Sequence, residues 1–126
     1  MPSRRRFLLP FPVLSALFAV ALGACTTMPP EDPRAAAERY QKVIASPLRT
    51  EQDLKIDASR HPAEFLPFTQ VQPGMRVLDV SAGAGYTSQL LALAVGPTGM
   101  VWAQTPNPGA ALQKRIADHP QANLVV

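Results

Sequence analysis

The chain has 126 residues, of which 47% are hydrophobic, and it carries a formal net charge of +3. A chain of this length has room for one small globular domain at most. The positive charge does not indicate nucleic-acid binding, because Arg4, Arg5 and Arg6 supply all of it and the rest of the chain has equal numbers of basic and acidic residues. Without a clustered basic face there is no surface for phosphate recognition, so we expect no nucleic-acid partner.

Residues 1–24 have the parts of an export signal. A basic segment that ends at Arg6 precedes an apolar stretch from Phe7 to Ala21, and the small residues Gly23 and Ala24 follow it. Prolines interrupt the apolar stretch, and it is shorter than the ~20 residues that a membrane-spanning helix needs. We therefore predict a signal peptide over residues 1–24 in preference to a permanent membrane span.

The end of this signal, Leu22-Gly23-Ala24-Cys25, resembles the lipobox of bacterial lipoproteins. The resemblance implies that Cys25 is lipidated and becomes the mature N-terminus, and that Thr26 after it favours the outer membrane of a double-membrane bacterium. We therefore expect an exported protein, anchored by lipid on the periplasmic side of the membrane. An ordinary secretory signal with a chance cysteine is the alternative. As Cys25 is the single cysteine, no disulfide can form within the chain.

The basic segment is also similar to the twin-arginine export motif, which it matches over Ser3-Arg4-Arg5-Arg6-Phe7-Leu8. That route carries folded proteins, so a domain could fold around a cytoplasmic cofactor before it crosses the membrane. Three arginines in this position are equally compatible with general secretion. The sequence leaves the export route open.

Residues 25–33 are polar and rich in proline, which is typical of a tether. Residues 34–70 predict a helical segment that begins with a helix over Arg34–Ala45. A second helix starts at the N-cap Thr50 with Asp53 at the third helical position, and a short third one starts at His61. We expect the first two helices to be peripheral. His61 and His119 each lie beside a proline at an element boundary, so we expect them to be surface or capping residues.

Residues 71–126 have the order strand, glycine-rich loop, helix, strand, helix, strand. The strands are expected at 76–80, 100–104 and 123–126, and the helices start near Tyr86 and Gly109. This order predicts an α/β fold with a Rossmann-like, doubly wound parallel sheet that is truncated after its third strand. The core candidates are apolar residues of the strands and the first helix: Leu78, Val80, Leu90, Leu91, Leu93, Val95, Val101 and Trp102.

The loop after the first strand favours a ligand site. Gly83 and Gly85 permit positive φ angles and close approach to the backbone, and the following helix points its free N–H groups at the same place. The run Asp79-Val80-Ser81-Ala82-Gly83-Ala84-Gly85-Tyr86, with Pro73-Gly74 upstream, resembles the first motif of the class I S-adenosylmethionine-dependent methyltransferases. The resemblance covers roughly residues 66–126, and the signal suggests an exported branch of that family.

That resemblance implies an S-adenosylmethionine-dependent methyltransferase, of which this chain holds the cofactor-binding half. Asp79 would hold the amino group of the methionine part, with Gly83 and Gly85 under the ligand. The full set of implied cofactor residues is Asp79, Ser81, Gly83, Gly85, Tyr86 and Thr105. No catalytic residue, methyl acceptor or oligomeric state can be named, and no metal-binding set of Cys and His is present.

Two positions depart from the family pattern. Ser81 replaces the usual first glycine, which is tolerable if its φ suits a non-glycine residue, and its hydroxyl could cap the next turn. Thr105 stands where the family has an acid for the ribose hydroxyls. A neutral group there makes weaker hydrogen bonds and costs about 1 to 2 kcal/mol of cofactor affinity.

Two alternatives remain. One is a nicotinamide dinucleotide, for which the loop would need a glycine at Ser88 and an acid near Thr105. The other is a non-catalytic, membrane-anchored lipoprotein with a degenerate Rossmann-like domain. In that case Gly83 and Gly85 only form a tight turn, and Asp79 caps the helix.

Overall fold

The computed structural model describes residues 31–126. The predicted signal peptide, Cys25 and most of the predicted tether lie outside these residues. Among the helices of residues 31–126, none combines the length and the apolar character needed to cross a membrane.

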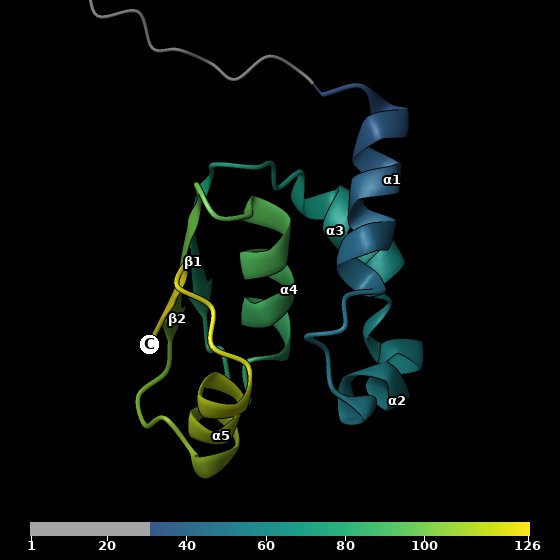
Figure 1. Cartoon of the computed structure of the whole chain (residues 1–126). Coiled ribbons are helices and arrows are strands. Elements are labelled where there is room, and N and C mark those ends of the chain that lie inside the picture. The colour runs from purple at the N-terminus through teal and green to yellow at the C-terminus, as the bar shows by residue number, and fades with distance from the viewer. Residues whose placement is uncertain (1–30) are drawn as a thin grey trace, which may run out of the picture.

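Three helices come first in the described residues, and short strands then alternate with helices, in the order predicted from the sequence (Figure 1). Their bounds are α1 Pro33–Ile44, α2 Glu51–Arg60, α3 Pro62–Thr69, β1 Arg76–Val80, α4 Tyr86–Val95, β2 Met100–Gln104, α5 Ala110–Asp118 and β3 Leu124–Val125. The helix α1 begins at Pro33, which the sequence assigned to the tether, and the Asp32 side chain caps it by accepting from the Arg34 N–H.

The strands form one parallel sheet in the order β1-β2-β3. Val80 at the end of β1 pairs with Gln104 at the end of β2, and Val101 pairs with Leu124 of β3. A three-stranded parallel sheet connected by helices is a mixed α/β structure, consistent with a truncated Rossmann-like fold. The predicted fold class and the predicted bounds of β1 and β2 are confirmed.

The helix α4 lies at the centre of the described structure. One side of it packs against the sheet, and the other side packs against α1 (Figure 1). A helix with neighbours on both sides needs apolar residues around most of its circumference, and this sequence provides them. Its buried apolar residues are Tyr86, Leu90, Leu91, Ala92, Ala94 and Val95.

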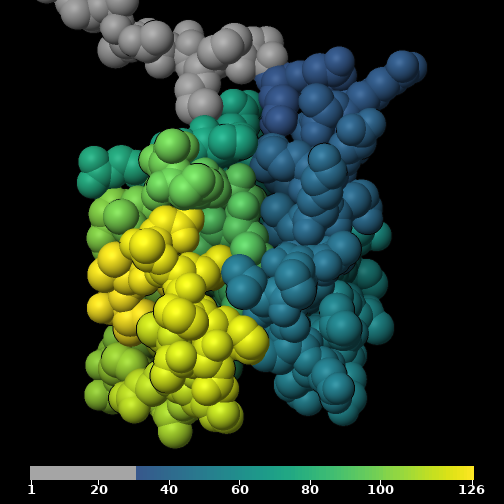
Figure 2. All heavy atoms as spheres, viewed as in Figure 1, coloured from purple at the N-terminus to yellow at the C-terminus, as the bar shows by residue number. Residues whose placement is uncertain are grey.

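Helix α1 is part of the core, so the expectation that it is peripheral was wrong, whereas α2 buries only Asp53. Tyr40 and Val43 of α1 are buried in the same apolar cluster as α4. The Tyr40 hydroxyl donates to the Val71 carbonyl at 2.9 Å, and Arg39 donates to the same carbonyl at 2.9 Å. Figure 2 shows α1 and α2 lying directly against the atoms of α4 and α5.

The two histidines lie at helix ends, as predicted. His61 is both the C-cap of α2 and the N-cap of α3, and its φ of 48° turns the chain sharply between the two helices. His119 ends α5. The described residues contain no cluster of His, Cys, Asp and Glu that could hold a metal ion.

The second face of the sheet is exposed in the described structure. Leu78 is 60% and Val80 is 66% exposed, so the prediction that both belong to the core was wrong. Alternate residues of a strand point to opposite faces, and these two exposed residues alternate with half-buried ones along β1. The described helices α1, α3 and α4 lie on one side of the sheet (Figure 1). On this exposed face, the Arg76 guanidinium lies 5.0 Å from the centre of the Trp102 ring, which is half-buried.

The same substitution should change the free energy of unfolding very differently in the core and on the exposed face of the sheet. Leu90 is 1% exposed in α4, so Leu90→Ala should lower the free energy of unfolding by about 2 to 5 kcal/mol because it leaves a cavity. Leu78→Ala, in β1, should change it by no more than about 0.5 kcal/mol. Urea unfolding of both variants measures the difference. A large loss in Leu78→Ala would mean that something covers this face in solution.

Candidate functional site

The carboxyl ends of β1 and β2 lie side by side and bring the predicted loop next to the end of β2. The register pairs Val80 with Gln104, and the Ala82 N–H donates to the Gln104 carbonyl at 3.0 Å. Thr105, which follows Gln104, is therefore adjacent to the loop over residues 81–85. In open parallel sheets, ligands bind at this edge of the strands.

The two glycines of this loop have different surroundings. Both have positive φ, 56° at Gly83 and 80° at Gly85. A Cβ atom on Gly83 would have one neighbour, the Ser81 carbonyl oxygen at 3.9 Å, so the space above Gly83 is open. A Cβ atom on Gly85 would lie 2.6 Å from Cδ1 of Leu112 in α5. Gly83 thus leaves room for a ligand, whereas Gly85 lets α5 pack against the loop.

The loop also leaves backbone donors free. Among the described residues, the N–H groups of Gly83 and Ala84 have no hydrogen-bond acceptor, and α4 has no side-chain cap at its start. The unpaired amides of the first turn of α4 therefore lie next to those of the loop. Such a group of amides favours an anionic or strongly polar ligand.

The sequence analysis required a φ at Ser81 that suits a non-glycine residue, and Ser81 does not have one. Its φ is 66°, in the left-handed region where glycine is the favoured residue. A serine in this conformation costs about 1 kcal/mol or more, so the loop is strained at this position. The Ser81 hydroxyl makes no hydrogen bond to any residue of the described part, so the predicted cap on the next turn is not formed.

The Asp79 carboxylate is held from the helix side. Ser88 of α4, which is fully buried, donates from its hydroxyl to Oδ2 of Asp79 at 2.5 Å. Asp79 is half-buried and does not cap α4, unlike in the ligand-free alternative. In the sequence analysis, Ser88 was named only as the position where the dinucleotide pattern would need a glycine. Its position in the first turn of α4 lets it orient the carboxylate.

Tyr86 points into the protein. It is 9% exposed, its hydroxyl donates to Oδ1 of Asp57 at 2.6 Å, and the Arg49 guanidinium lies 5.5 Å from the centre of its ring. Arg49 also pairs with Asp57 and donates to the Ile44 carbonyl at 2.8 Å. Burial, and then the hydrogen bond to Asp57, raise the pKa of Tyr86 above its ordinary value. The side chain of Tyr86 therefore anchors α4 to α2.

A second buried ion pair lies directly behind the loop. Arg115 of α5 donates from Nη1 and Nη2 to the two carboxylate oxygens of Asp53, at 2.8 and 2.6 Å. Its Nε donates to the Ala84 carbonyl of the loop at 2.8 Å, and Nη1 also donates to Gln89 of α4. Asp53 is 1% exposed.

No pattern in the sequence indicates this ion pair. Thr50 and Asp53 do form the predicted capping box, with both reciprocal hydrogen bonds present. That local role already accounted for Asp53, and Arg115 is far away in the chain. Burial by itself raises the pKa of Asp53, but the hydrogen bonds from Arg115 and Thr50 outweigh it and lower the pKa to about 2.

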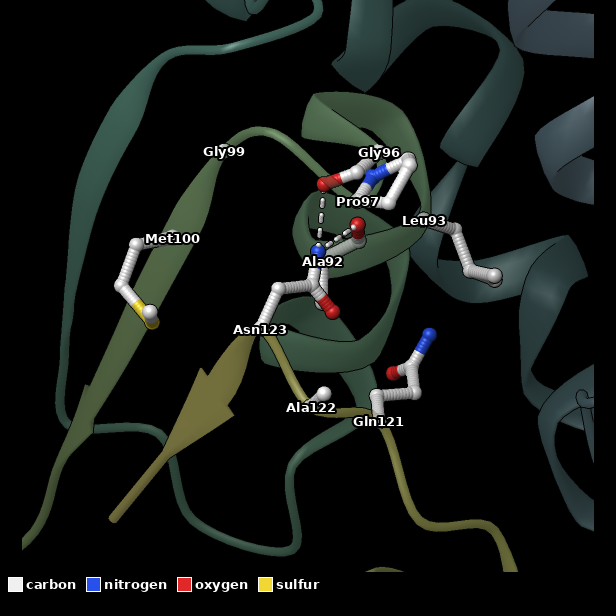
Figure 3. A pocket seen from close by; sticks show the side chains of 9 residues that line it. All are labelled: Ala92, Leu93, Gly96, Pro97, Gly99, Met100, Gln121, Ala122 and Asn123. Atoms are coloured by element: carbon white, nitrogen blue, oxygen red, sulfur yellow. Dashed lines mark hydrogen bonds between the residues drawn. The ribbon is translucent and has the colours of Figure 1, made fainter.

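The hollow drawn in Figure 3 lies at the opposite end of the sheet. It has a volume of about 350 Å³ and is lined by the end of α4, the start of β2 and the residues before β3. There the Asn123 side chain donates to the carbonyls of Ala92 and Gly96, both at 2.8 Å (Figure 3). Asn123 thus fixes the C-terminal end of α4, and this hollow is distinct from the candidate site.

Comparison of the sequence with known protein families identifies the family of this chain. The family model described as protein-L-isoaspartate(D-aspartate) O-methyltransferase (PCMT) matches residues 33–114, which is more than half of the chain. The chain therefore belongs to the PCMT family, one of the class I S-adenosylmethionine-dependent methyltransferase families. The match includes α1 to α4, the loop and the start of α5. No curated protein and no solved structure matches the chain.

The Asp53–Arg115 pair should make the fold sensitive to acid. The pKa of Asp53 is lowered from 3.8 to about 2 in the folded protein, so the pair adds stability above the ordinary pKa and loses it as the pH falls. Urea unfolding at a series of pH values should show the free energy of unfolding falling between about pH 4 and about pH 2. This decrease in the free energy of unfolding with falling pH should be smaller in Asp53→Asn.

Asp118→Asn is the matched control, because Asp118 pairs with Lys114 on the exposed side of α5. An exposed pair is screened by solvent, so this variant should keep nearly the whole slope of the wild type. Equal slopes in the wild type and Asp53→Asn would contradict the assignment.

Proposed function

We propose that the chain binds S-adenosylmethionine at the carboxyl ends of β1 and β2, as the cofactor-binding part of a methyltransferase. Membership of the PCMT family supports this cofactor, since methyltransferases of that family use S-adenosylmethionine. Membership of this family argues against the alternative of a nicotinamide dinucleotide. The observation that carries the proposal is the open space above Gly83, next to free amides and an oriented carboxylate.

The residues fit this cofactor in two respects. The carboxylate of Asp79, fixed by Ser88, is suited to the ammonium group of the methionine part. The bare backbone at Gly83 permits close approach of the ligand, and Ser81 borders the same opening. In one respect the fit is poor, because Thr105 offers a neutral hydroxyl where two ribose hydroxyls favour a carboxylate.

Methyl transfer requires the acceptor atom to be held in line with the sulfonium methyl group, so positioning is the main contribution of the protein. The family name points to a carboxylate oxygen of an isoaspartyl or D-aspartyl residue in a protein as the acceptor. We propose that acceptor class as the first to test, with transfer of labelled methyl groups to an isoaspartyl peptide and to its aspartyl isomer.

Isothermal titration of the full chain with S-adenosylmethionine tests the cofactor directly. Asp79→Ala should weaken binding by at least about tenfold, because it removes a charge-assisted hydrogen bond. Thr105→Glu should tighten binding by about fivefold to thirtyfold, the equivalent of about 1 to 2 kcal/mol. Gln113→Ala, on the exposed side of α5, is the control and should bind like the wild type. If the wild type gives no heat at millimolar ligand, the non-catalytic alternative replaces this proposal.

We further propose that the protein is exported and anchored through a lipid on Cys25, facing the periplasm. The support is the order of basic, apolar and small residues before a single cysteine. In this arrangement the lipid links the mature protein to the membrane.

Cys25→Ala should therefore move the protein from the membrane fraction to the soluble fraction of the cells. Cell fractionation followed by immunoblotting measures this, with Thr26→Ala as the neighbouring control. Retention of Cys25→Ala in the membrane fraction would refute lipidation.

A further inference from the structure

We propose that Arg115 is a positioning residue for the cofactor loop, residues 81–85. It holds the loop from behind in the shape that receives the ligand, and it uses Asp53 of α2 as its anchor. This inference rests on the proposed function, since it assigns a role to a residue outside the sequence motif.

The first step is the contact with the loop itself. Nε of Arg115 donates to the Ala84 carbonyl at 2.8 Å, and the Gly85 N–H donates to the Ala82 carbonyl at 2.8 Å. Both polar groups of the peptide between Ala84 and Gly85 are therefore engaged. A Cβ atom on Gly85 would lie 3.1 Å from Cδ of Arg115, so the arginine stem lies close against the loop.

The second step is the anchor. The other two nitrogens of the guanidinium bind both oxygens of the Asp53 carboxylate, and the Thr50 N–H binds Oδ2 of Asp53 at 2.8 Å. Nη1 reaches Gln89 of α4 as well. One guanidinium thus connects α2, the loop, α4 and α5. Figure 2 shows the segment around α2 in contact with the C-terminal part of the chain that contains α5.

The third step concerns what this arrangement does for a ligand. A loop with two glycines has many conformations available, and ordering it upon binding would reduce the affinity. Arg115 fixes the Ala84–Gly85 peptide before the ligand arrives, while the amides of Gly83 and Ala84 remain free of protein acceptors among the described residues. The loop is therefore preorganised for binding.

An arginine is required for this role. Its planar group presents several N–H donors in a fixed fork, so it can bind a carboxylate with two nitrogens and a carbonyl with the third. A lysine could neutralise Asp53, but its donors all lie on one nitrogen, so it cannot reproduce the contacts that Arg115 makes with Ala84 and with both Asp53 oxygens from three nitrogens. This difference separates positioning of the loop from simple pairing of a buried charge.

The experiment compares Arg115→Lys with Lys114→Gln, the neighbouring substitution that removes an exposed ion pair from α5. On the full chain we measure the dissociation constant of S-adenosylmethionine by titration and amide hydrogen exchange by NMR. Arg115→Lys should keep the fold but weaken binding about tenfold or more, and the Gly85 amide should exchange about tenfold faster, as expected for the loss of one charge-assisted hydrogen bond. Exchange at Leu91 in α4 should be unchanged. Lys114→Gln should match the wild type in every measurement.

The outcomes separate this inference from the proposed function. Wild-type binding and wild-type Gly85 exchange in Arg115→Lys would overturn it, since charge pairing would then be sufficient. If the wild type itself binds no S-adenosylmethionine, the proposed function fails, and Gly85 exchange alone decides whether Arg115 holds the loop. If Arg115→Lys does not fold, the double variant D53N/R115Q, which leaves no unpaired buried charge, is measured in the same way. Unchanged Gly85 exchange in that variant would also overturn the inference.

Discussion

The burial of α4 is the constraint on which the rest of the described structure depends. This helix packs between the sheet and α1, and its apolar side chains form most of the core cluster. Because its N-terminus follows the glycine loop directly, fixing α4 against the sheet also fixes the loop and the free amides beside it. The position of the candidate site is therefore a consequence of core packing.

Polar contacts within the interior complete this arrangement. Each of two arginines, Arg49 and Arg115, pairs with an aspartate of α2. Charges removed from water are costly unless they are paired and hydrogen-bonded, and both pairs have additional partners in α4. These contacts give α2 a defined position against α4 and α5. The N-terminal helices therefore belong to the same structural unit as the sheet, in agreement with a family match that includes both.

The exposed face of the sheet, unlike the face that packs against α4, is not covered by any helix of the described structure. Leu78 and Val80 have the apolar character of core residues, and the parallel arrangement of the strands is typical of sheets covered on both faces. In the described structure the helices that contact the sheet lie on one face only. The apolar pattern of a strand reports what the residues prefer to contact, and it does not specify which element supplies the contact.

The sequence by itself determined the order of the elements, the bounds of β1 and β2, and the strand–loop–helix unit around Gly83. These features depend on local patterns of hydrophobicity, glycine and proline, which act over a few residues. Only the tertiary structure decided that Ser88 orients Asp79, that Tyr86 points inward, and that Asp53 meets Arg115. Those contacts join residues of different elements, which come together only when the helices pack. No local pattern in the sequence therefore records them. The same reason explains the error about Leu78 and Val80, because burial depends on neighbours that a strand does not encode.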